Sequence, residues 1–259
     1  MTTPASFNGL QNDGTDANGQ PSLKALTQRQ ERRLIAYLDE QFLELTRGFK
    51  KRAEPTTHLP TLSHYLVAAQ QILVMILQVP PVEPSRSLRT AYLLRLTNDV
   101  LNSIPGYPAD HRIMPRVVDW LDDLDQAWVA VLRSQVWDME DGVGVDVEPE
   151  GKNEEEMISV DTYDEINGKA KKYPVSQTDI TRLKSLLLAG VARLEEWVGG
   201  IGKGETGAND VETMMARMGV RDGLEDLFSS TWDELGEFAG YVLEQADEAV
   251  MEDSICEAD

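Results

Sequence analysis

The segment GGIGKGETG, at residues 199–207, brings together residue types that can bind phosphate. A phosphate-binding loop requires G-x-x-x-x-G-K-[ST] between a strand and a helix, because its backbone N–H groups, lysine and hydroxyl hold the phosphates and Mg²⁺. Gly202 and Lys203 fit, but Trp197 stands where the first glycine belongs and Gly204 where the hydroxyl belongs. The glycines also fit G-x-G-x-x-G, yet a helical pattern rather than a strand precedes them. We interpret the segment as a connector in which Gly199 or Gly200 ends a helix in the left-handed conformation.

A second group of residues that could do chemistry is acidic. Residues 122–125 read DDLD, whereas all-helical prenyl and terpene synthases hold magnesium with DDxxD. In a possible second motif, at residues 209–217, Arg217 stands where a glutamate ligand is needed. The three histidines have no cysteine or acidic partners at metal-ligand spacing. The sequence therefore predicts no catalytic residue, no metal site and no cofactor, and we interpret DDLD as a solvated helical face.

Charge divides the chain into two unlike halves. Residues 1–136 contain 14 Lys/Arg and 14 Asp/Glu, whereas residues 137–259 contain 10 and 31, which accounts for the whole net charge of −21. An acidic half is repelled by nucleic acid and by anionic lipid, so direct nucleic-acid binding is not expected from it. The acidity either keeps a helical protein soluble or attracts a basic partner.

The elements that would position any site are helices. Apolar residues recur every three to four positions in successive segments separated by Pro and Gly, which indicates amphipathic helices. The expected helices span about 27–50, 61–78, 85–104, 115–132 and 176–198, followed by a short methionine-rich helix and a final pair. Thr27, Ser176 and Thr231 are the expected N-caps, and residues 61–78 are expected to be the central helix because they are apolar on most faces.

The pattern predicts an all-α fold, a bundle of six to eight helices with a disordered N-terminus and a long acidic insertion. The alternating residues 143–149 have no expected strand partner, so we expect no strand. The expected organisation is a disordered tail at 1–26, a first helical part at 27–137, an acidic flexible insertion at 138–175, a second helical part at 176–250 and a frayed tail at 251–259.

Two sets of residues are candidates for contacts. Four basic residues at the end of the first helix form either a nuclear-import signal or cations that complement the helix dipole; they are Arg47, Lys50, Lys51 and Arg52. Large apolar side chains in the second set either contact a partner or lie in the core; they are Trp137, Met214, Met215 and Met218.

Four segments carry a resemblance to a known family: RRLIAYLDEQFLELTRGFKKR (32–52), LPTLSHYLVAAQQILVMILQVPP (59–81), LRTAYLLRLTNDVLNSIPGYP (88–108) and WLDDLDQAWVAVLRSQVWD (120–138). Together they resemble the fungal family of the sixth Tfb-type accessory subunit of TFIIH, over about residues 28–198 without the acidic insertion. The resemblance implies a nuclear, non-catalytic subunit that associates with the XPB-type helicase and promotes its release from TFIIH. It assigns no individual functional residue.

The leading hypothesis is thus a nuclear adaptor that acts through protein partners, possibly a helicase subunit of TFIIH, in transcription and DNA repair. The alternative is an acidic assembly chaperone or nucleic-acid mimic that shields a basic protein such as a histone or ribosomal protein. No membrane association is expected, because the most apolar run, residues 65–79, is too short to span a bilayer.

Overall fold

The computed structural model describes residues 24–146, 175–199 and 226–236. Its elements are α1 (Gln28–Lys50), α2 (Leu62–Leu77), α3 (Ser85–Ser103), η1 (Ile104–Gly106), α4 (Met114–Leu132), β1 (Val136–Asp138), β2 (Val143–Val145), α5 (Gln177–Val198) and α8 (Ser229–Glu234). The all-α class is confirmed, with six α-helices in the described part of the chain. Three predictions concern segments outside the described residues: the disordered N-terminal tail, the methionine-rich helix and the frayed C-terminus.

The caps predicted for two of the helices are present. The Thr27 side chain accepts a hydrogen bond from the Gln30 backbone N–H, and the Gln30 side chain accepts one from the Thr27 backbone N–H, 2.9 Å away. Ser176 begins α5 by accepting from the backbone N–H of Asp179 at 3.2 Å. These bonds satisfy N–H groups that have no partner inside the first turn of a helix.

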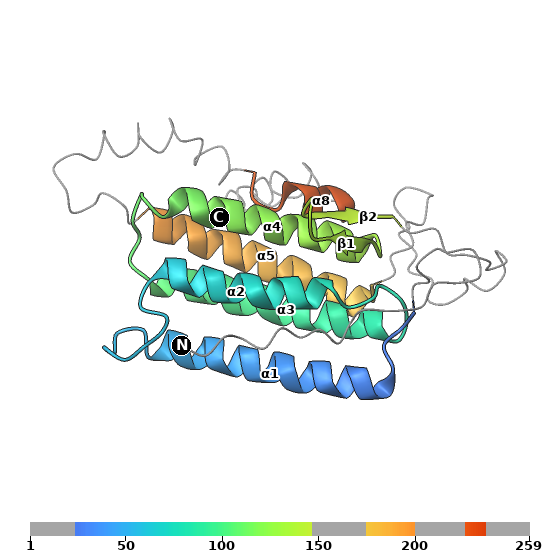
Figure 1. The fold of residues 1–259 in the computed structure, drawn as a ribbon. Helices are drawn as coiled ribbons and strands as arrows, with labels where there is room; N and C mark the ends of the chain where they lie inside the picture. Colours follow the sequence, from blue (N-terminus) through green and yellow to red (C-terminus); the bar gives the residue numbers. More distant parts are fainter. Residues whose placement is uncertain (1–23, 147–174, 200–225, 237–259) are drawn as a thin grey trace, which may run out of the picture.

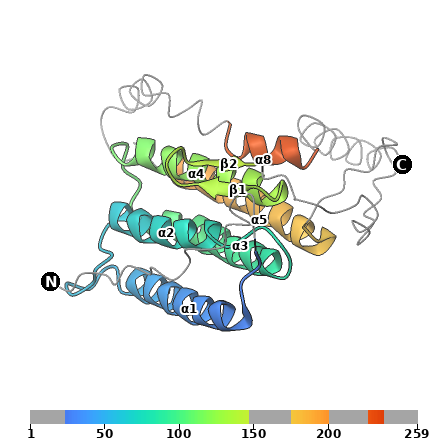
Figure 2. The same cartoon turned by 45° about the vertical axis from the view of Figure 1, so that its right-hand side comes forward.

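The helices lie in successive layers, as Figures 1 and 2 show. Helix α1 packs on α2 and α3, which form the middle of the bundle. Helices α4 and α5 lie on the opposite side from α1, and α8 and the strand pair pack on α4. Buried apolar residues of α1, α2, α3, α4 and α5 form one cluster with Phe228 and Leu235, which flank α8, so residues far apart in the sequence share a single core.

Helix α2 lies in the middle of the bundle, as its apolar pattern predicts, and α3 shares that position. Helix α3 contacts α1, α2, α4 and α5, and it buries polar residues that weaken its apolar pattern. Thr97 is one example: its hydroxyl donates to the Leu93 carbonyl at 2.8 Å and accepts from the Trp128 indole N–H at 3.0 Å. Polar groups with hydrogen-bond partners can be buried at little cost, so a wholly apolar pattern does not identify every central helix.

Helices α3 and α5 approach closely at Gly190. A Cβ atom placed on Gly190 would lie 3.1 Å from Cγ of Leu101, and closer still to one of its methyl groups. Because Gly190 has no side chain, α3 and α5 can pack closely, although the acidic stretch separates them in the sequence.

The expectation of no strand after α4 was wrong. Val136–Asp138 pairs antiparallel with Val143–Val145, with Trp137 opposite Gly144. The hairpin packs on α4, so residues 138–146 are part of the packed structure. The partner strand was missed because β1 has only three residues and begins four positions after the end of α4, which is too short a stretch to show an alternating pattern.

One predicted N-cap was also wrong, and one of the two glycines proposed to end α5 in the left-handed conformation is excluded. Thr231 is not an N-cap but a buried residue inside α8, whose N-cap position is Phe228. Gly199 ends α5 in a right-handed conformation, with φ −60°, and Gly200 lies outside the described residues.

Candidate functional site

Two charged side chains are almost fully buried in the described part of the chain, one on α4 and one on α3. Asp125 of α4 is 3% exposed and Arg89 of α3 is 1% exposed. Neither residue was singled out from the sequence, although both lie on an apolar stripe. Asp125 is in phase with Leu121 and Trp128, and Arg89 with Leu93 and Leu96. A charged residue inside an apolar helical stripe was the signal that could have found them.

Asp125 holds α8 against α4. Its Oδ1 accepts from the backbone N–H of Thr231 at 2.8 Å, and its Oδ2 from that of Ser230 at 3.1 Å. The Thr231 hydroxyl also donates to Oδ1. Ser230 and Thr231 are the second and third residues of α8, where an N-cap side chain normally accepts. Since Phe228 offers no side-chain cap, Asp125 caps α8 from a different helix.

The rim of this contact is held by more exposed pairs. Arg133 Nε lies 2.9 Å from Glu234 Oε2, and the Gln126 side chain donates to the Ser230 hydroxyl at 3.4 Å. The interpretation of residues 122–125 as a solvated face therefore holds for Asp122 and Asp123, which are exposed, but is wrong for Asp125.

Arg89 joins α3 to the segment that follows α4. Its Nη1 donates to the Gln135 backbone carbonyl at 2.7 Å. Nε and Nη2 have no hydrogen-bond partner in the described structure. Burial lowers the pKa of Arg89 to about 10, so the guanidinium is still charged at neutral pH.

The contacts around Arg89 link it to the base of the hairpin. Gln135 donates through its backbone to the Ala130 carbonyl at 2.8 Å and through its side chain to Asp146 Oδ1 at 2.9 Å. We call Arg89, Gln135 and Asp146 the hairpin junction. It ties together α3, the end of α4 and the residue after β2.

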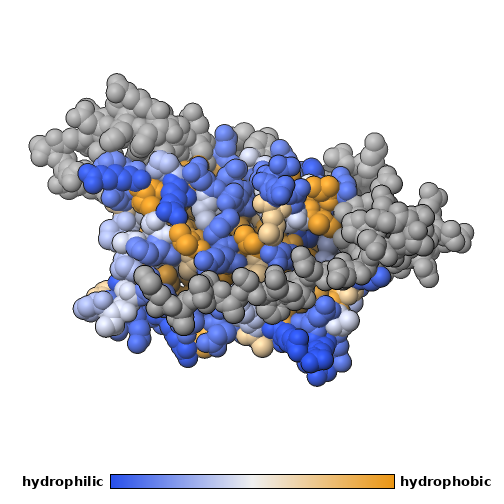
Figure 3. Space-filling model, viewed as in Figure 1, coloured by the Kyte–Doolittle hydropathy of each residue, from blue (hydrophilic) through white to orange (hydrophobic). Residues whose placement is uncertain are grey.

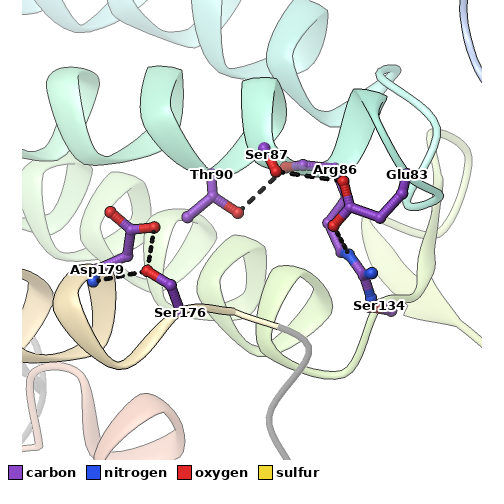
Figure 4. Close-up of polar contacts among 7 residues, drawn as sticks. All are labelled: Glu83, Arg86, Ser87, Thr90, Ser134, Ser176 and Asp179. Atoms are coloured by element: carbon purple, nitrogen blue, oxygen red, sulfur yellow. Dashed lines mark hydrogen bonds and ion pairs between the residues drawn. The ribbon is translucent and has the colours of Figure 1, made fainter. Parts of the chain in front are cut away.

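A neighbouring arginine on α3 is paired, in contrast to Arg89. Arg86 Nε lies 2.9 Å from Glu83 Oε1, and its Nη1 donates to the Ser134 hydroxyl at 3.4 Å. Ser87 donates to the second oxygen of Glu83 at 3.2 Å. Figure 4 shows these residues with Thr90 and with the cap of α5, where Ser176 donates to Asp179 at 2.7 Å. The carboxylates drawn there are therefore already occupied.

The four basic residues at the end of α1 do not have equivalent surroundings. Arg52 is half-buried, donates to the Gly106 carbonyl at 2.8 Å and stacks over the Phe49 ring, 4.4 Å from its centroid. Arg47 pairs with Glu44 at 2.9 Å and Lys51 lies 3.9 Å from Glu54. Arg47, Lys50 and Lys51 are exposed. Arg52 thus anchors the end of α1 to the loop after α3.

Trp137, a predicted contact residue, lies in β1 and is partly buried against the core. Met214, Met215 and Met218 lie outside the described residues. The hairpin nevertheless exposes other apolar side chains: Met139 is 61% exposed, and Val143 and Val145 are exposed as well. Half of the exposed large hydrophobic residues of the described ranges therefore lie on this one hairpin. Figure 3 shows a mostly hydrophilic surface interrupted by separate hydrophobic areas.

The solvent side of α4 is acidic. Although the Asp122 residue is exposed overall, partial burial of its carboxyl, with the nearby charges of Asp125 and Asp119, raises the pKa of Asp122 above its usual value. Burial also raises the pKa of Asp123, opposed by a hydrogen bond from Gln70 and assisted by the charges of Asp122 and Asp119. The described residues contain no group of three or more His, Cys, Asp or Glu side chains placed to hold a metal ion. Among the same residues, no helix is long and apolar enough to cross a bilayer.

Comparison with known proteins adds no relative. No family model matches the chain, and neither a curated protein nor a solved structure is significantly similar to it.

Proposed function

We propose that this protein is a non-catalytic adaptor: a nuclear accessory subunit of TFIIH that contacts the XPB-type helicase and promotes its dissociation. The four segments that carry the resemblance to the TFIIH accessory family correspond to α1, α2, α3 with η1, and α4 with β1. Their buried residues share one core. Arg47, Lys50 and Lys51 are exposed at the end of α1 and remain the candidates for nuclear import.

The observation that carries the adaptor function is the exposed apolar surface of the hairpin. Met139, Val143 and Val145 lie within seven residues of one another and are all exposed. Buried anchors at the centre of an interface supply most of the binding energy in protein complexes. We propose that these three side chains form the centre of the contact with the partner.

The packing beneath the hairpin suits it to such a role. A Cβ atom placed on Gly144 would lie 2.8 Å from Cβ of Ala130, so β2 lies directly against α4. Trp137 supports the strand pair from the core side. A surface fixed in this way loses little conformational entropy on binding, which favours affinity.

The rival function, an acidic chaperone for a basic protein, is favoured by the net charge of −21 and by the acidic face of α4. Contacts of this kind depend on charge, and salt therefore weakens them strongly. The adaptor contact rests on apolar side chains, and salt is expected to affect it much less.

The test is affinity purification of the full chain from fungal nuclear extract, followed by binding to the purified XPB-type helicase. The variant Met139→Ser/Val143→Thr/Val145→Thr is compared with Leu43→Ser/Leu188→Ser, which removes exposed apolar side chains elsewhere. We expect recovery of TFIIH subunits with the wild type and the control, and at least about tenfold weaker helicase binding by the hairpin variant.

Two outcomes would overturn the proposal. Recovery of histones or ribosomal proteins in a salt-sensitive complex, without TFIIH subunits, would favour the chaperone. Equal helicase binding by the hairpin variant and the control would exclude the hairpin as the contact surface.

A further inference from the structure

The side of the hairpin that points away from α4 is apolar. A Cβ atom on Gly144 would lie 2.8 Å from Cβ of Ala130, so Gly144 faces α4. Because side chains alternate along a strand, Val143 and Val145 point away from α4, and both are exposed. Val136 lies opposite Val145 in the strand register and therefore shares this outer side.

Met139 extends the apolar surface at the turn. Its side chain is 61% exposed, and its sulfur accepts a hydrogen bond from the Gln78 side chain at 3.2 Å. That bond links the turn to the residue that ends α2. A methionine side chain adapts to apolar partners of irregular shape. We call Val136, Met139, Val143 and Val145 the hairpin face.

Acidic side chains border the hairpin face. Asp138 lies opposite Val143, Glu140 and Asp141 lie in the turn, and Asp146 follows β2. Glu140, Asp141 and Asp146 are exposed. From residue 134 to residue 151 the sequence contains no Lys, Arg or His. The hairpin therefore surrounds its apolar side chains with carboxylates and has no cationic side chain of its own.

These carboxylates have no cationic partner in the described structure. The Asp138 side chain accepts from the backbone N–H groups of Glu140 and Asp141, at 2.8 and 3.4 Å. Asp146 accepts from the Gln135 amide at 2.9 Å. No ion pair joins any of the four to a described Lys, Arg or His. Their charges can therefore pair with cations of a partner.

The combination of apolar and acidic side chains defines the class of partner. Nucleic acids and anionic membranes are repelled by an acidic surface. A neutral apolar surface would cover the carboxylates at the edge of the contact without supplying counter-charges. A protein segment with apolar side chains flanked by lysine or arginine fits both parts, with an apolar centre and ion pairs at the rim.

We propose that the hairpin face binds a basic, apolar segment of a partner protein, whose lysine or arginine side chains pair with Glu140 and Asp141. The inference rests on the proposed function in its choice of the hairpin as the contact surface. It adds that the contact region of the XPB-type helicase is basic as well as apolar. Because rim charges act mainly on the rate of association, salt slows binding while the apolar contact is retained.

The test uses the full chain with ¹³C-methyl-labelled methionine and follows the methionine methyl signals by NMR. The probe is a synthetic amphipathic peptide built from leucine and lysine. Serine replaces leucine in one control peptide, and glutamate replaces lysine in the other. Met139→Leu assigns the Met139 signal, and Met114, which is fully buried, is the internal reference.

We expect the Met139 signal to shift saturably with the leucine–lysine peptide, and the affinity for either control peptide to be at least about fivefold weaker. Glu140→Gln/Asp141→Asn is expected to weaken binding of the leucine–lysine peptide at least about threefold. The matched control, Glu195→Gln/Glu196→Gln, also removes two adjacent exposed carboxylates, from the last turn of α5. It should leave the affinity unchanged.

Three results would overturn the proposal. The first is the absence of a saturable shift at Met139. The second is equal binding of a control peptide, which would show that charge alone or apolar contact alone is sufficient. The third is equal weakening by the two double variants, which would assign the effect to the net charge of the chain. Because the experiment contains no helicase, a chain that binds the peptide as expected but not the helicase would overturn only the proposed function.

Discussion

Asp125 and Arg89 are both charged and both buried, yet their surroundings differ. The Asp125 carboxylate receives two backbone N–H groups and a hydroxyl from α8. Arg89 makes one hydrogen bond, to the Gln135 carbonyl, and leaves two donor atoms without a partner in the described residues. Among the described residues, the Asp125 carboxylate has hydrogen-bond donors for both of its oxygens, whereas two nitrogens of Arg89 have no acceptor.

The difference is between a buried charge whose hydrogen bonds compensate its burial and one whose burial is only partly compensated. Asp125, with several donors around its carboxylate, fixes the position of α8, a helix of six residues. Arg89, with two donor atoms unpaired in the described structure, is held at a larger cost in desolvation. Substitutions at the two regions are expected to have different consequences for stability.

The largest expected effect is at the α4–α8 contact. Asp125→Ala leaves the N–H groups of Ser230 and Thr231 and the Thr231 hydroxyl without their acceptor. We expect a loss of about 3 kcal/mol in the free energy of unfolding, limited by the free energy with which α8 is docked. Urea unfolding measures the loss, and amide hydrogen exchange at Ser230 and Thr231 reports detachment of α8.

Asp122→Ala, on the exposed side of the same helix, is the control. We expect it to change the free energy of unfolding by less than about 0.5 kcal/mol. Unchanged exchange at Ser230 and Thr231 in Asp125→Ala would show that apolar packing, rather than the carboxylate, holds α8.

A smaller effect is expected at the hairpin junction. A Cβ on Gly144 would collide with the Gln135 side chain and lie 2.8 Å from Cβ of Ala130. Gly144→Ala therefore has to move the hairpin away from α4, and we expect a loss of about 1–3 kcal/mol. Thermal unfolding measures it, and the Arg89 Nε–Hε signal in ¹⁵N NMR reports whether the displacement reaches the guanidinium.

The matched substitution in the turn is Gly142→Asn. Gly142 has φ +66°, and a Cβ placed on it would have no other atom within 4 Å. Asparagine tolerates this conformation better than other residues with a side chain. We expect less than about 1 kcal/mol of destabilisation and no change at Arg89. Equal effects of the two glycine substitutions would argue against close packing of β2 on α4.

The local parts of the fold were predictable from the sequence because they depend on nearby residues. The apolar spacing of α1 and the caps at Thr27 and Ser176 act within four residues, and both caps are confirmed. The hairpin was not predictable from alternation alone, because β1 has only three residues. The central position of α3 depends on packing with helices from both sides of the acidic stretch.

The buried charges were missed for a related reason. Asp125 caps residues that are 105 and 106 positions away in the sequence, so the capping pattern around Thr231 pointed to the wrong local acceptor. Arg89 finds its carbonyl 46 positions away. The position of Asp125 and Arg89 on apolar stripes indicates that both are buried. Only the fold shows which of the two charges has hydrogen-bond partners in the described structure.

The smallest expected effect on stability is that of substituting Asp123, an exposed aspartate of α4, in contrast to the buried Asp125. Asp123 has a raised pKa, so its folded state binds a proton more readily than the unfolded chain does. The native contribution of Asp123 to stability therefore falls as pH rises from the usual value of 3.8 through the raised pKa. Asp123→Asn removes the charge four residues from Asp119 and retains an oxygen for Gln70. We expect a gain of about 0.2–0.5 kcal/mol at neutral pH, measured by urea unfolding.

The pH dependence of this gain decides its cause. Because Asp123 is protonated in both states well below pH 3.8, the gain from Asp123→Asn is expected to vanish there. Asp123→Ala also removes the acceptor of the Gln70 side chain, 3.0 Å away, and should therefore gain less than Asp123→Asn. A gain of the same size in acid and at neutral pH would exclude the negative charge of Asp123, through its burial or its repulsion by Asp122 and Asp119, as the cause. A loss of unfolding free energy in Asp123→Ala as large as that in Asp125→Ala would show that Asp123 is an equally important hydrogen-bond acceptor. The buried and exposed sides of α4 would then not differ as proposed.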